Sequence, residues 1–305
     1  MRVAAVDCGT NSVRLLVADL DGSLDEVERR MEIVRLGQGV DRTGRLAPEA
    51  LERTFTAMRG YRELIDHHGA VATRVVATSA TRDAANRHEF VDGVRAIFGV
   101  EPEVVTGAEE AELSFTGATR GLRLDGGRPC LVVDIGGGST EFVVGGEHVE
   151  GAISVDIGCV RLTERHLRGE AEPPSAQKLE AVVADIDDAL DRVTAEVPVE
   201  RAHTLVGLAG SVTTVAGIAL GLPEYDADKI HQSRISAEQV HEVTRRLLAM
   251  THGERAVLPV MHPGRVDVIG AGALILDRIV RRFGFEQVVV SEHDILDGIA
   301  WSLRR

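Results

Sequence analysis

Hydrophobic and polar positions along the chain predict the same α/β layout twice. In the first part, alternating or continuous apolar runs predict strands, and Asp21-Gly22 is a hairpin signal between the second and third of them. Apolar residues at helical spacing follow, with Pro48 at the start of a helix and Gly69 at its end. The predicted strands are 2–6, 13–19, 26–35, 74–77 and 104–105, and the predicted helices are 48–68, 81–98 and 107–121.

After a linker-like stretch at 123–129, rich in Gly and Pro, the order restarts. The second part has predicted strands at 130–134, 140–145, 148–156, 203–208 and 286–290, and predicted helices at 159–168, 175–195, 211–220, 236–250, 264–282 and 294–303. Three antiparallel strands followed by alternating helices and strands, twice over, are typical of two ribonuclease-H-like lobes. We therefore expect an α/β protein with lobes at 1–124 and 125–305 and a central cleft between them. The terminal helix at about 294–303 is free to pack back on the first lobe.

One polar phrase occurs in both parts, between the first two predicted strands. Asp7-Cys8-Gly9-Thr10-Asn11-Ser12 and Asp134-Ile135-Gly136-Gly137-Gly138-Ser139-Thr140 match at a constant offset of 127, since 134 − 7 and 139 − 12 are equal. Glycine permits backbone conformations that turn several N–H groups toward one anion, and hydroxyls add donors. An ordinary hairpin with an Asx-turn explains one copy, but two copies favour phosphate-binding turns. The predicted phosphate contacts are Gly9, Thr10, Asn11, Ser12, Gly136, Gly137, Gly138, Ser139 and Thr140.

Carboxylates beside these turns suit a divalent cation. Asp7 and Asp134 end their strands, where each can hold Mg²⁺ directly or through water. Glu141 lies seven residues after Asp134, so a tight hairpin brings the two carboxylates together at its mouth. A solvent-facing strand glutamate is the alternative for Glu141. We expect Asp134, Glu141 and Asp7 to be metal ligands.

A helix start at Thr106 carries a further candidate. Thr106 and Glu109 have the spacing of a capping box, which gives Glu109 a structural role. Glu110 lies about 100° further round the helix and has no such role. A carboxylate there could orient a water molecule and remove its proton, although spacing alone does not assign this function.

A third turn lies in the uncharged stretch 204–223. The glycines and hydroxyls of this stretch argue against a membrane span and for a strand, a turn and a buried helix. Gly210 and Ser211 would lie at a helix N-terminus, which attracts anions. The alternative is a buried connection that needs small residues. Arginines in or near these segments, among them Arg161 and Arg265, could form a local positive patch. Arg14 and Arg82 are expected to bind substrate phosphate directly.

Composition and short motifs limit the partners and the classes of chemistry to be expected. The formal charge of −14 makes the surface as a whole repel polyanions, so nucleic acid is not an expected partner. The three cysteines are widely spaced and form no Cys-x-x-Cys pair, which argues against zinc and disulfides and favours a cytoplasmic location. Gly-x-Ser-x-Gly, the local signature of many serine hydrolases, is absent.

At these residues the chain resembles the exopolyphosphatase/guanosine pentaphosphate phosphohydrolase family, within the actin-like ATPase superfamily. The matching segments span the chain in order and are specific as a set. They are Asp7-x-Gly-x-Asn11-Ser12-x-Arg14-Leu15, 77–86, Gly107-x-Glu109-Glu110-Ala111, Asp134–Glu141, Gly158-x-Val160-Arg161-Leu162-Thr163-Glu164-Arg165, Gly207-x-Ala209-Gly210-Ser211 and Arg265-x-Asp267-x-Ile269-x-Ala271-Gly272. Two departures are Cys8, where a small aliphatic residue is usual, and Glu112, where a basic residue is frequent.

The resemblance implies two actin-like lobes with the active site in the cleft. It makes Glu110 the general base, Asp134 and Glu141 Mg²⁺ ligands, and the turns at 9–12, 136–140 and 209–211 phosphate cradles. The implied reaction is stepwise Mg²⁺-dependent release of orthophosphate from inorganic polyphosphate, by a homodimer. Hydrolysis of guanosine pentaphosphate is the nearest alternative, followed by a kinase of the superfamily and a non-catalytic alarmone sensor.

Overall fold

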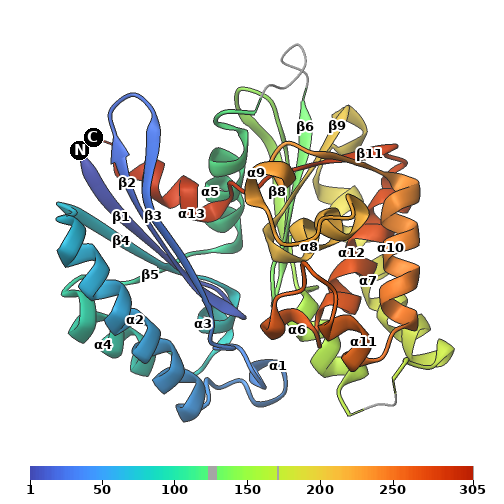
Figure 1. Ribbon diagram of the computed structural model, residues 1–305, viewed down its shortest axis with the longest axis horizontal. Helices are drawn as coiled ribbons and strands as arrows, with labels where there is room; N and C mark the ends of the chain where they lie inside the picture. The colour runs from blue at the N-terminus through green and yellow to red at the C-terminus, as the bar shows by residue number, and fades with distance from the viewer. Residues whose placement is uncertain (123–128, 170–171, 305) are drawn as a thin grey trace. The chain divides into compact units, whose positions relative to one another are not determined.

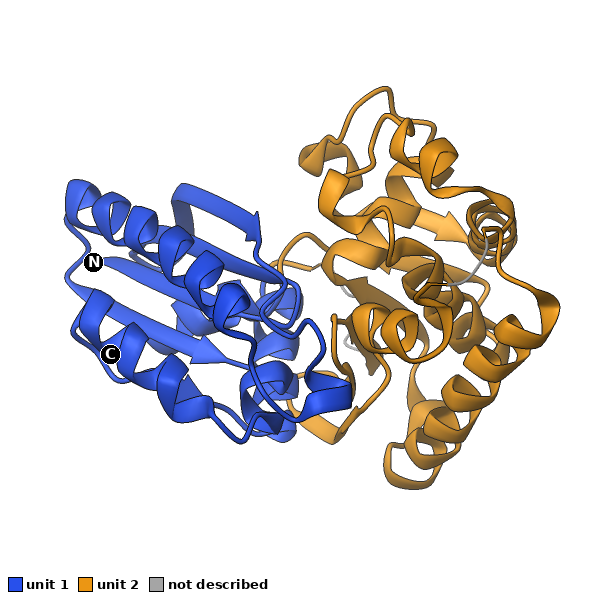
Figure 2. Ribbon diagram, turned by 90° about the horizontal axis from the view of Figure 1, so that it is seen from below, with its two compact units in different colours: residues 1–120, 294–305 blue, residues 121–293 orange. Residues whose placement is uncertain are grey.

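The computed structural model describes residues 1–122, 129–169 and 172–304, and divides the chain into two compact units. Unit 1 comprises Met1–Arg120 and Asp294–Arg305, and unit 2 comprises Gly121–His293 (Figure 2). The predicted boundary between 124 and 125, within the predicted linker, lies outside the described residues.

Unit 1 is built on a five-stranded sheet of order β3-β2-β1-β4-β5 (Figure 1). β1 pairs antiparallel with β2 and parallel with β4. The strands are β1 (Arg2–Cys8), β2 (Ser12–Leu20), β3 (Leu24–Ile33), β4 (Ala72–Ala77) and β5 (Glu103–Val104). The helices are α1 (Val40–Thr43), α2 (Pro48–His68), α3 (Ser79–Asp83), α4 (Arg87–Phe98), α5 (Gly107–Thr119) and α13 (Ile295–Ser302).

Alternate residues of β1 serve the two faces of this sheet. Ala4 and Val6 belong to the core that α2 and α4 cover, whereas Val3 and Ala5 pack in a second core with α13 and Leu113 of α5. Asp7 continues the Val3–Ala5 face, so its side chain lies on the side of the sheet that carries α5 and α13. The last helix of the chain, α13, therefore covers the face of the unit 1 sheet on which the candidate residue Asp7 lies.

Helices α5 and α13 approach each other closely through glycine. A Cβ at Gly298 would lie 2.0 Å from the Leu113 carbonyl oxygen, and one at Gly117 would lie 1.8 Å from that of Asp294. Both obstacles are backbone atoms, which cannot rotate aside as a side chain can. Only glycine fits at this crossing.

Gly298→Val is expected to lower the free energy of unfolding by about 3 kcal/mol, because the added side chain forces α13 off α5. Gly60→Ala, at an exposed site of α2 with no heavy atom near the added Cβ, should instead raise it by up to about 1 kcal/mol. Urea unfolding of both variants measures the difference. A Gly298→Val protein as stable as the wild type would contradict this packing.

Unit 2 repeats the arrangement with one strand added, in the order β10-β11-β9-β6-β7-β8. The strands are β6 (Cys130–Ile135), β7 (Thr140–Gly145), β8 (Val149–Val155), β9 (Thr204–Leu208), β10 (Arg234–Ser236) and β11 (Gln287–Val290). The helices are α6 (Cys159–Leu162), α7 (Ala176–Glu196), α8 (Ala209–Ala219), α9 (Ala227–Ile230), α10 (Ala237–Ala249), α11 (His252–Ala256) and α12 (Ile269–Phe283). In both units the first strand lies between an antiparallel and a parallel neighbour. The predicted ribonuclease-H-like α/β topology is confirmed.

Several predicted element bounds were wrong. The helix predicted over 81–98 is interrupted before Arg87, because the Asn86 side chain accepts from Leu46 N at 2.8 Å and donates to Leu46 O at 3.0 Å. The helix predicted over 264–282 begins as a 3₁₀ turn at Pro263–Arg265 and becomes α-helical only at Ile269. The helix predicted over 159–168 changes after α6 into a π-helical turn, Thr163–Leu167. The short elements α1, α9, β10 and α11 were not predicted.

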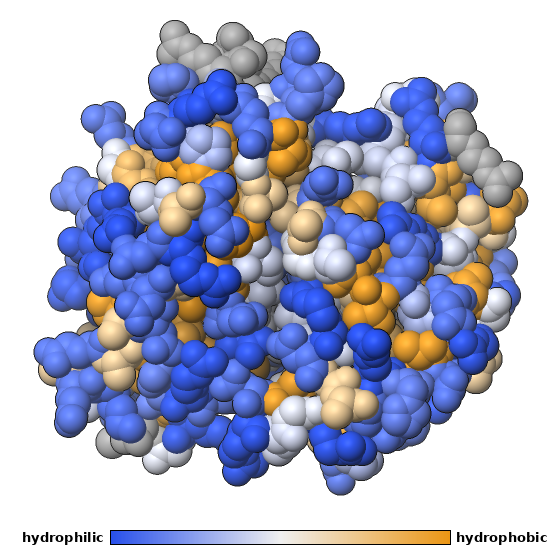
Figure 3. Space-filling model, turned by 180° about the vertical axis from the view of Figure 1, so that it is seen from behind, coloured by the Kyte–Doolittle hydropathy of each residue, from blue (hydrophilic) through white to orange (hydrophobic). Residues whose placement is uncertain are grey.

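The uncharged stretch that begins at Thr204 forms β9 and α8. None of the helices that the structure describes combines the length and the apolar composition needed to cross a lipid bilayer. On the face drawn in Figure 3, hydrophilic residues predominate and hydrophobic ones lie in small separate groups. Scattered exposed apolar residues are normal on a globular protein and do not mark a binding surface.

Candidate active site

The two copies of the polar phrase form equivalent turns. Gly9 N donates to Ser12 O and Gly136 N donates to Ser139 O, both at 3.0 Å. Each turn follows the central strand of its sheet at the carboxyl end, where α/β sheets bind ligands. The sequence repeat therefore marks the same place in both units.

The partner of the aspartate differs between the copies. Asp7 lies directly opposite Arg14 in the β1–β2 ladder, whereas Asp134 lies directly opposite Glu141 in the β6–β7 ladder. Opposite residues of an antiparallel pair project on the same face and their side chains are close. Unit 1 thus pairs a carboxylate with a guanidinium, and unit 2 places two carboxylates side by side.

In unit 1, Arg14 forms hydrogen bonds to both Asp7 and Asp294, the residue before helix α13. Its Nε and Nη2 donate to Asp7 Oδ2 at 2.9 and 2.7 Å, and its Nη1 donates to Asp294 Oδ2. Burial raises the pKa of the Asp7 carboxyl, and the charge of Arg14 opposes that rise. Asp7 Oδ1 is buried with no hydrogen-bond partner among the residues that the structure describes. One oxygen of Asp7 is therefore fixed and the other remains able to accept a ligand.

Glu110 lies on the first turn of α5 and is buried. Helix spacing alone does not reveal this burial, so it could not assign a function to the residue. The predicted capping box is confirmed, since Glu109 Oε2 accepts from Thr106 N at 2.8 Å and Thr106 Oγ1 accepts from Glu109 N. Glu110 is 7% exposed, and its Oε2 accepts from Arg82 Nη1 at 3.0 Å. Arg82 also donates to Val105 O at 3.0 Å, which fixes the guanidinium. A general base must be positioned within reach of the proton it takes, and Arg82 holds the Glu110 carboxylate in one orientation.

Parallel pairing of β1 and β4 brings another hydroxyl to the first turn. Cys8 is in register with Ala77, so Thr10 and Ser79 each lie two residues beyond the ends of paired strands. Their hydroxyl oxygens are 2.9 Å apart and both side chains are buried. Ser79 was not predicted, because only the register of two strands far apart in the chain reveals it.

In unit 2, the carboxylate pair is buried. Asp134 is 7% exposed and Glu141 2% exposed, and Glu141 Oε1 accepts from Ser154 Oγ at 2.7 Å. The hydroxyl of Thr140 donates to Ile157 O and thus helps to hold the turn itself. Two carboxylates directly opposite one another repel, so the pair favours a bound cation.

The third turn lies beside the second, because Asp134 is in register with Leu208 at the end of β9. Ala209 has φ of 66°, a left-handed conformation that costs an alanine energy and often marks a functional site. A Cβ at Gly210 would lie 2.3 Å from Cζ of Arg265, and one at Gly272 would lie 2.3 Å from Ser211 Oγ. Glycine therefore lets a guanidinium lie against the start of α8. The sequence made Arg265 a member of a possible positive patch, and the structure places its guanidinium against Gly210.

The comparisons with known proteins agree with this geometry. The Ppx/GppA phosphatase family matches residues 15–304. The chain belongs to this family. It is 50% identical over 316 residues to exopolyphosphatase 2 of Mycobacterium tuberculosis, covering 99% of this chain and 98% of that protein. It is 29% identical to guanosine-5'-triphosphate,3'-diphosphate pyrophosphatase of Aeromonas salmonicida, covering 98% of this chain and 59% of that protein.

Solved structures give the same result. The crystal structure of an exopolyphosphatase-like protein superposes with a TM-score of 0.94 at 44% identity, covering 99% of this chain and 98% of that one. The Ppx/GppA family member from Aquifex aeolicus gives a TM-score of 0.83 at 31% identity, covering 99% and 97%.

The carboxylates of this Ppx/GppA phosphatase suit a divalent cation that a substrate helps to bind. No three His, Cys, Asp or Glu side chains within 1–122, 129–169 and 172–304 gather into a ready-made metal site. Mg²⁺ is commonly held by only one or two carboxylates together with water and substrate phosphates. In unit 2 the pair Asp134–Glu141 fits that pattern, and in unit 1 the open Oδ1 of Asp7 can by itself accept a ligand.

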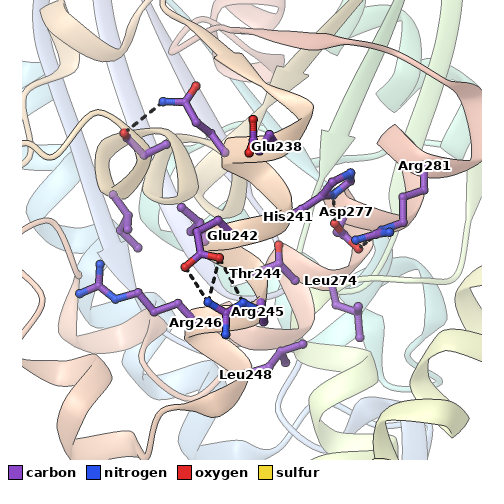
Figure 4. Close-up of a pocket in the computed structure, with 14 residues that line it drawn as sticks. Glu238, His241, Glu242, Thr244, Arg245, Arg246, Leu248, Leu274, Asp277 and Arg281 are labelled. Atoms are coloured by element: carbon purple, nitrogen blue, oxygen red, sulfur yellow. Dashed lines mark hydrogen bonds and ion pairs between the residues drawn. The ribbon is translucent and has the colours of Figure 1, made fainter.

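Unit 2 also carries an open groove of about 850 Å³ (Figure 4). It is lined mainly by α10 and α12, and none of the predicted site residues lines it. Asp277 there pairs with His241 and, at 2.8 Å, with Arg281 Nε, while Arg245 pairs with Glu242. Most of its charges are thus neutralised within the groove, and the phosphatase chemistry is assigned to the turns.

Proposed function

We propose that this Ppx/GppA phosphatase is an exopolyphosphatase that removes orthophosphate stepwise from the end of inorganic polyphosphate. The observation that carries the proposal is the buried Glu110, oriented by Arg82 at 3.0 Å. A Gly-Ser turn beside a carboxylate pair, in the same chain, supplies what a phosphoanhydride needs besides a base. The 50% identity to exopolyphosphatase 2 supports the choice of substrate.

In the proposed reaction, Glu110 accepts the proton of a water molecule as its oxygen attacks the terminal phosphorus. The bridging P–O bond breaks, and the shortened chain leaves with the bridging oxygen. The N–H groups of the turns at 9–12 and 136–139, with Ser211 and Arg265, stabilise charge on the phosphoryl oxygens. Asp134, Glu141 and Asp7 would hold Mg²⁺, which neutralises phosphate charge when bound. Arg14 holds Asp7 in place, and its charge opposes the rise in the pKa of Asp7 that burial causes.

The proposal includes its setting. We infer a cytoplasmic homodimer, as the family resemblance implies, and the three buried free cysteines suit a reducing compartment. The formal net charge of −14 repels a polyanion, so capture of polyphosphate would depend on local groups such as Arg265 and on bound cations.

The substrate is tested by measuring orthophosphate release with Mg²⁺ from short polyphosphate, long polyphosphate, guanosine pentaphosphate and ATP. We expect kcat/KM for at least one polyphosphate to exceed that for guanosine pentaphosphate by at least tenfold, and ATP to be a poor substrate. The reverse ranking would assign the guanosine pentaphosphate activity instead. Phosphate transfer from ATP to an acceptor, without release, would assign a kinase.

A further inference from the structure

The glycine turn of unit 2 is held from behind by one short segment. Each of its three glycine carbonyls accepts a hydrogen bond from the residues that begin α6. Cys159 N donates to Gly136 O at 3.0 Å, Val160 N and Arg161 N donate to Gly137 O at 2.9 and 3.0 Å, and Arg161 Nε donates to Gly138 O at 2.6 Å.

Peptide geometry determines where the N–H groups of the turn point. In a planar trans peptide, the C=O and the following N–H point in opposite directions. Because the carbonyls of Gly136, Gly137 and Gly138 all point toward α6, the N–H groups of Gly137, Gly138 and Ser139 point to the other side. Across the three ranges that the structure describes, these N–H groups have no hydrogen-bond acceptor. The segment behind the turn therefore presents three adjacent N–H groups for an anion.

The approach of the segment depends on Gly158. A Cβ at this position would lie 2.3 Å from the Gly137 carbonyl oxygen and 2.6 Å from the carbonyl carbon of Gly138. Gly158 has φ of −140°, which any residue adopts, so space and not conformation requires the glycine. The Arg161 side chain is only 12% exposed, and its Nη2 lies 3.9 Å from Asp156 Oδ1.

Unit 1 backs its own turn in the same way. Val34 N and Arg35 N donate to Asn11 O at 3.0 and 2.8 Å, and Gly37 N donates to Thr10 O at 2.8 Å. In each unit the backing segment follows the third strand, β3 or β8. The recurrence shows that the arrangement belongs to the turn itself. In unit 2 the side chain of Arg161 also supports it.

We propose that Arg161 is a positioning residue for phosphoanhydride hydrolysis. It fixes the peptide between Gly138 and Ser139 so that the third N–H group converges with the other two on the phosphoryl group. In this role Arg161 acts through the turn, by its bond to Gly138 O. The inference rests on the proposed function for its substrate, but the donor array it describes would serve any terminal phosphate.

Arg161→Gln is expected to lower kcat about 50-fold with KM changed less than threefold, because a misdirected donor is lost mainly from the transition state. Arg161→Lys, which keeps a donor at the end of a long side chain, should recover at least fivefold of that loss. The matched control is Arg278→Gln, which removes another partly buried arginine of unit 2, paired with Asp187 at 2.8 Å; its kcat should stay within twofold of wild type. Equal kcat for Arg161→Gln and Arg278→Gln at equal melting temperature would overturn the proposal.

Backbone amide NMR separates this proposal from the substrate assignment. With Mg²⁺ and methylenediphosphonate, which is not hydrolysed, the amide signals of Gly137, Gly138 and Ser139 should move in the wild type, and that of Ser139 much less in Arg161→Gln. If the wild type releases no phosphate from polyphosphate but shows these shifts, the proposed function fails and the positioning role stands. Absent shifts in the wild type, or equal shifts in Arg161→Gln, would overturn the positioning role whatever the substrate.

Discussion

Replacing Glu110 with glutamine is expected to lower kcat for polyphosphate about 1,000-fold while KM changes less than threefold. The amide keeps the shape of the side chain and can still contact Arg82, but it cannot take a proton from water. General-base catalysis typically contributes 10²–10⁴-fold, and this base has no obvious substitute on α5. Steady-state phosphate release at saturating Mg²⁺ measures the effect.

The control for this substitution is Glu112→Gln, an exposed carboxylate two residues further along α5. It should retain kcat within threefold of the wild type. Because Glu110 is buried, thermal unfolding must show that Glu110→Gln folds as the wild type does. Activity within tenfold of wild type in folded Glu110→Gln would remove Glu110 from the role of base.

Asp134→Asn is expected to affect catalysis and stability differently. In the wild type Asp134 faces Glu141 directly across the ladder, so replacing one charge relieves repulsion and the melting temperature without metal should fall little, if at all. Activity should nevertheless fall at least 100-fold, and the Mg²⁺ concentration for half-maximal activity should rise at least tenfold, because a metal ligand is lost.

Binding gives a second readout that does not depend on turnover. A ligand that binds only the folded state raises its melting temperature, so Mg²⁺ with methylenediphosphonate should stabilise the wild type more than Asp134→Asn. Asp188→Asn, at an exposed aspartate of α7, should behave as the wild type does. Equal stabilisation of the wild type and Asp134→Asn would show that Asp134 does not hold the metal.

The parts of the site that follow from short-range spacing were predictable. The seven-residue spacing across a tight hairpin predicted that Asp134 and Glu141 come together, and in the structure they lie directly opposite each other. The capping box at Thr106 left Glu110 as the carboxylate without a local role, and the structure buries it beside Arg82. Periodicity and turn chemistry are local properties, so the two lobes could also be read from the sequence.

Contacts between distant segments were not predictable in the same way. Asp294 reaches Arg14 across 280 positions of sequence, and Ser79 reaches Thr10 through strand pairing. The break before α4 depends on two hydrogen bonds between the Asn86 side chain and the backbone of Leu46, 40 residues earlier. Nothing in the sequence distinguishes Arg161 from a surface arginine, because its bond to Gly138 O depends on how the turn and α6 pack together. Local sequence patterns around these residues do not predict their partners, which lie far away in the sequence.

Hydrolysis in ¹⁸O-labelled water, followed by ³¹P NMR, tests the central claim most directly. If a water molecule activated by Glu110 attacks the terminal phosphorus, each orthophosphate released while most of the chain remains will carry one oxygen from solvent, and the remaining chain will carry none. Label in the new chain end, or unlabelled orthophosphate, would contradict the account.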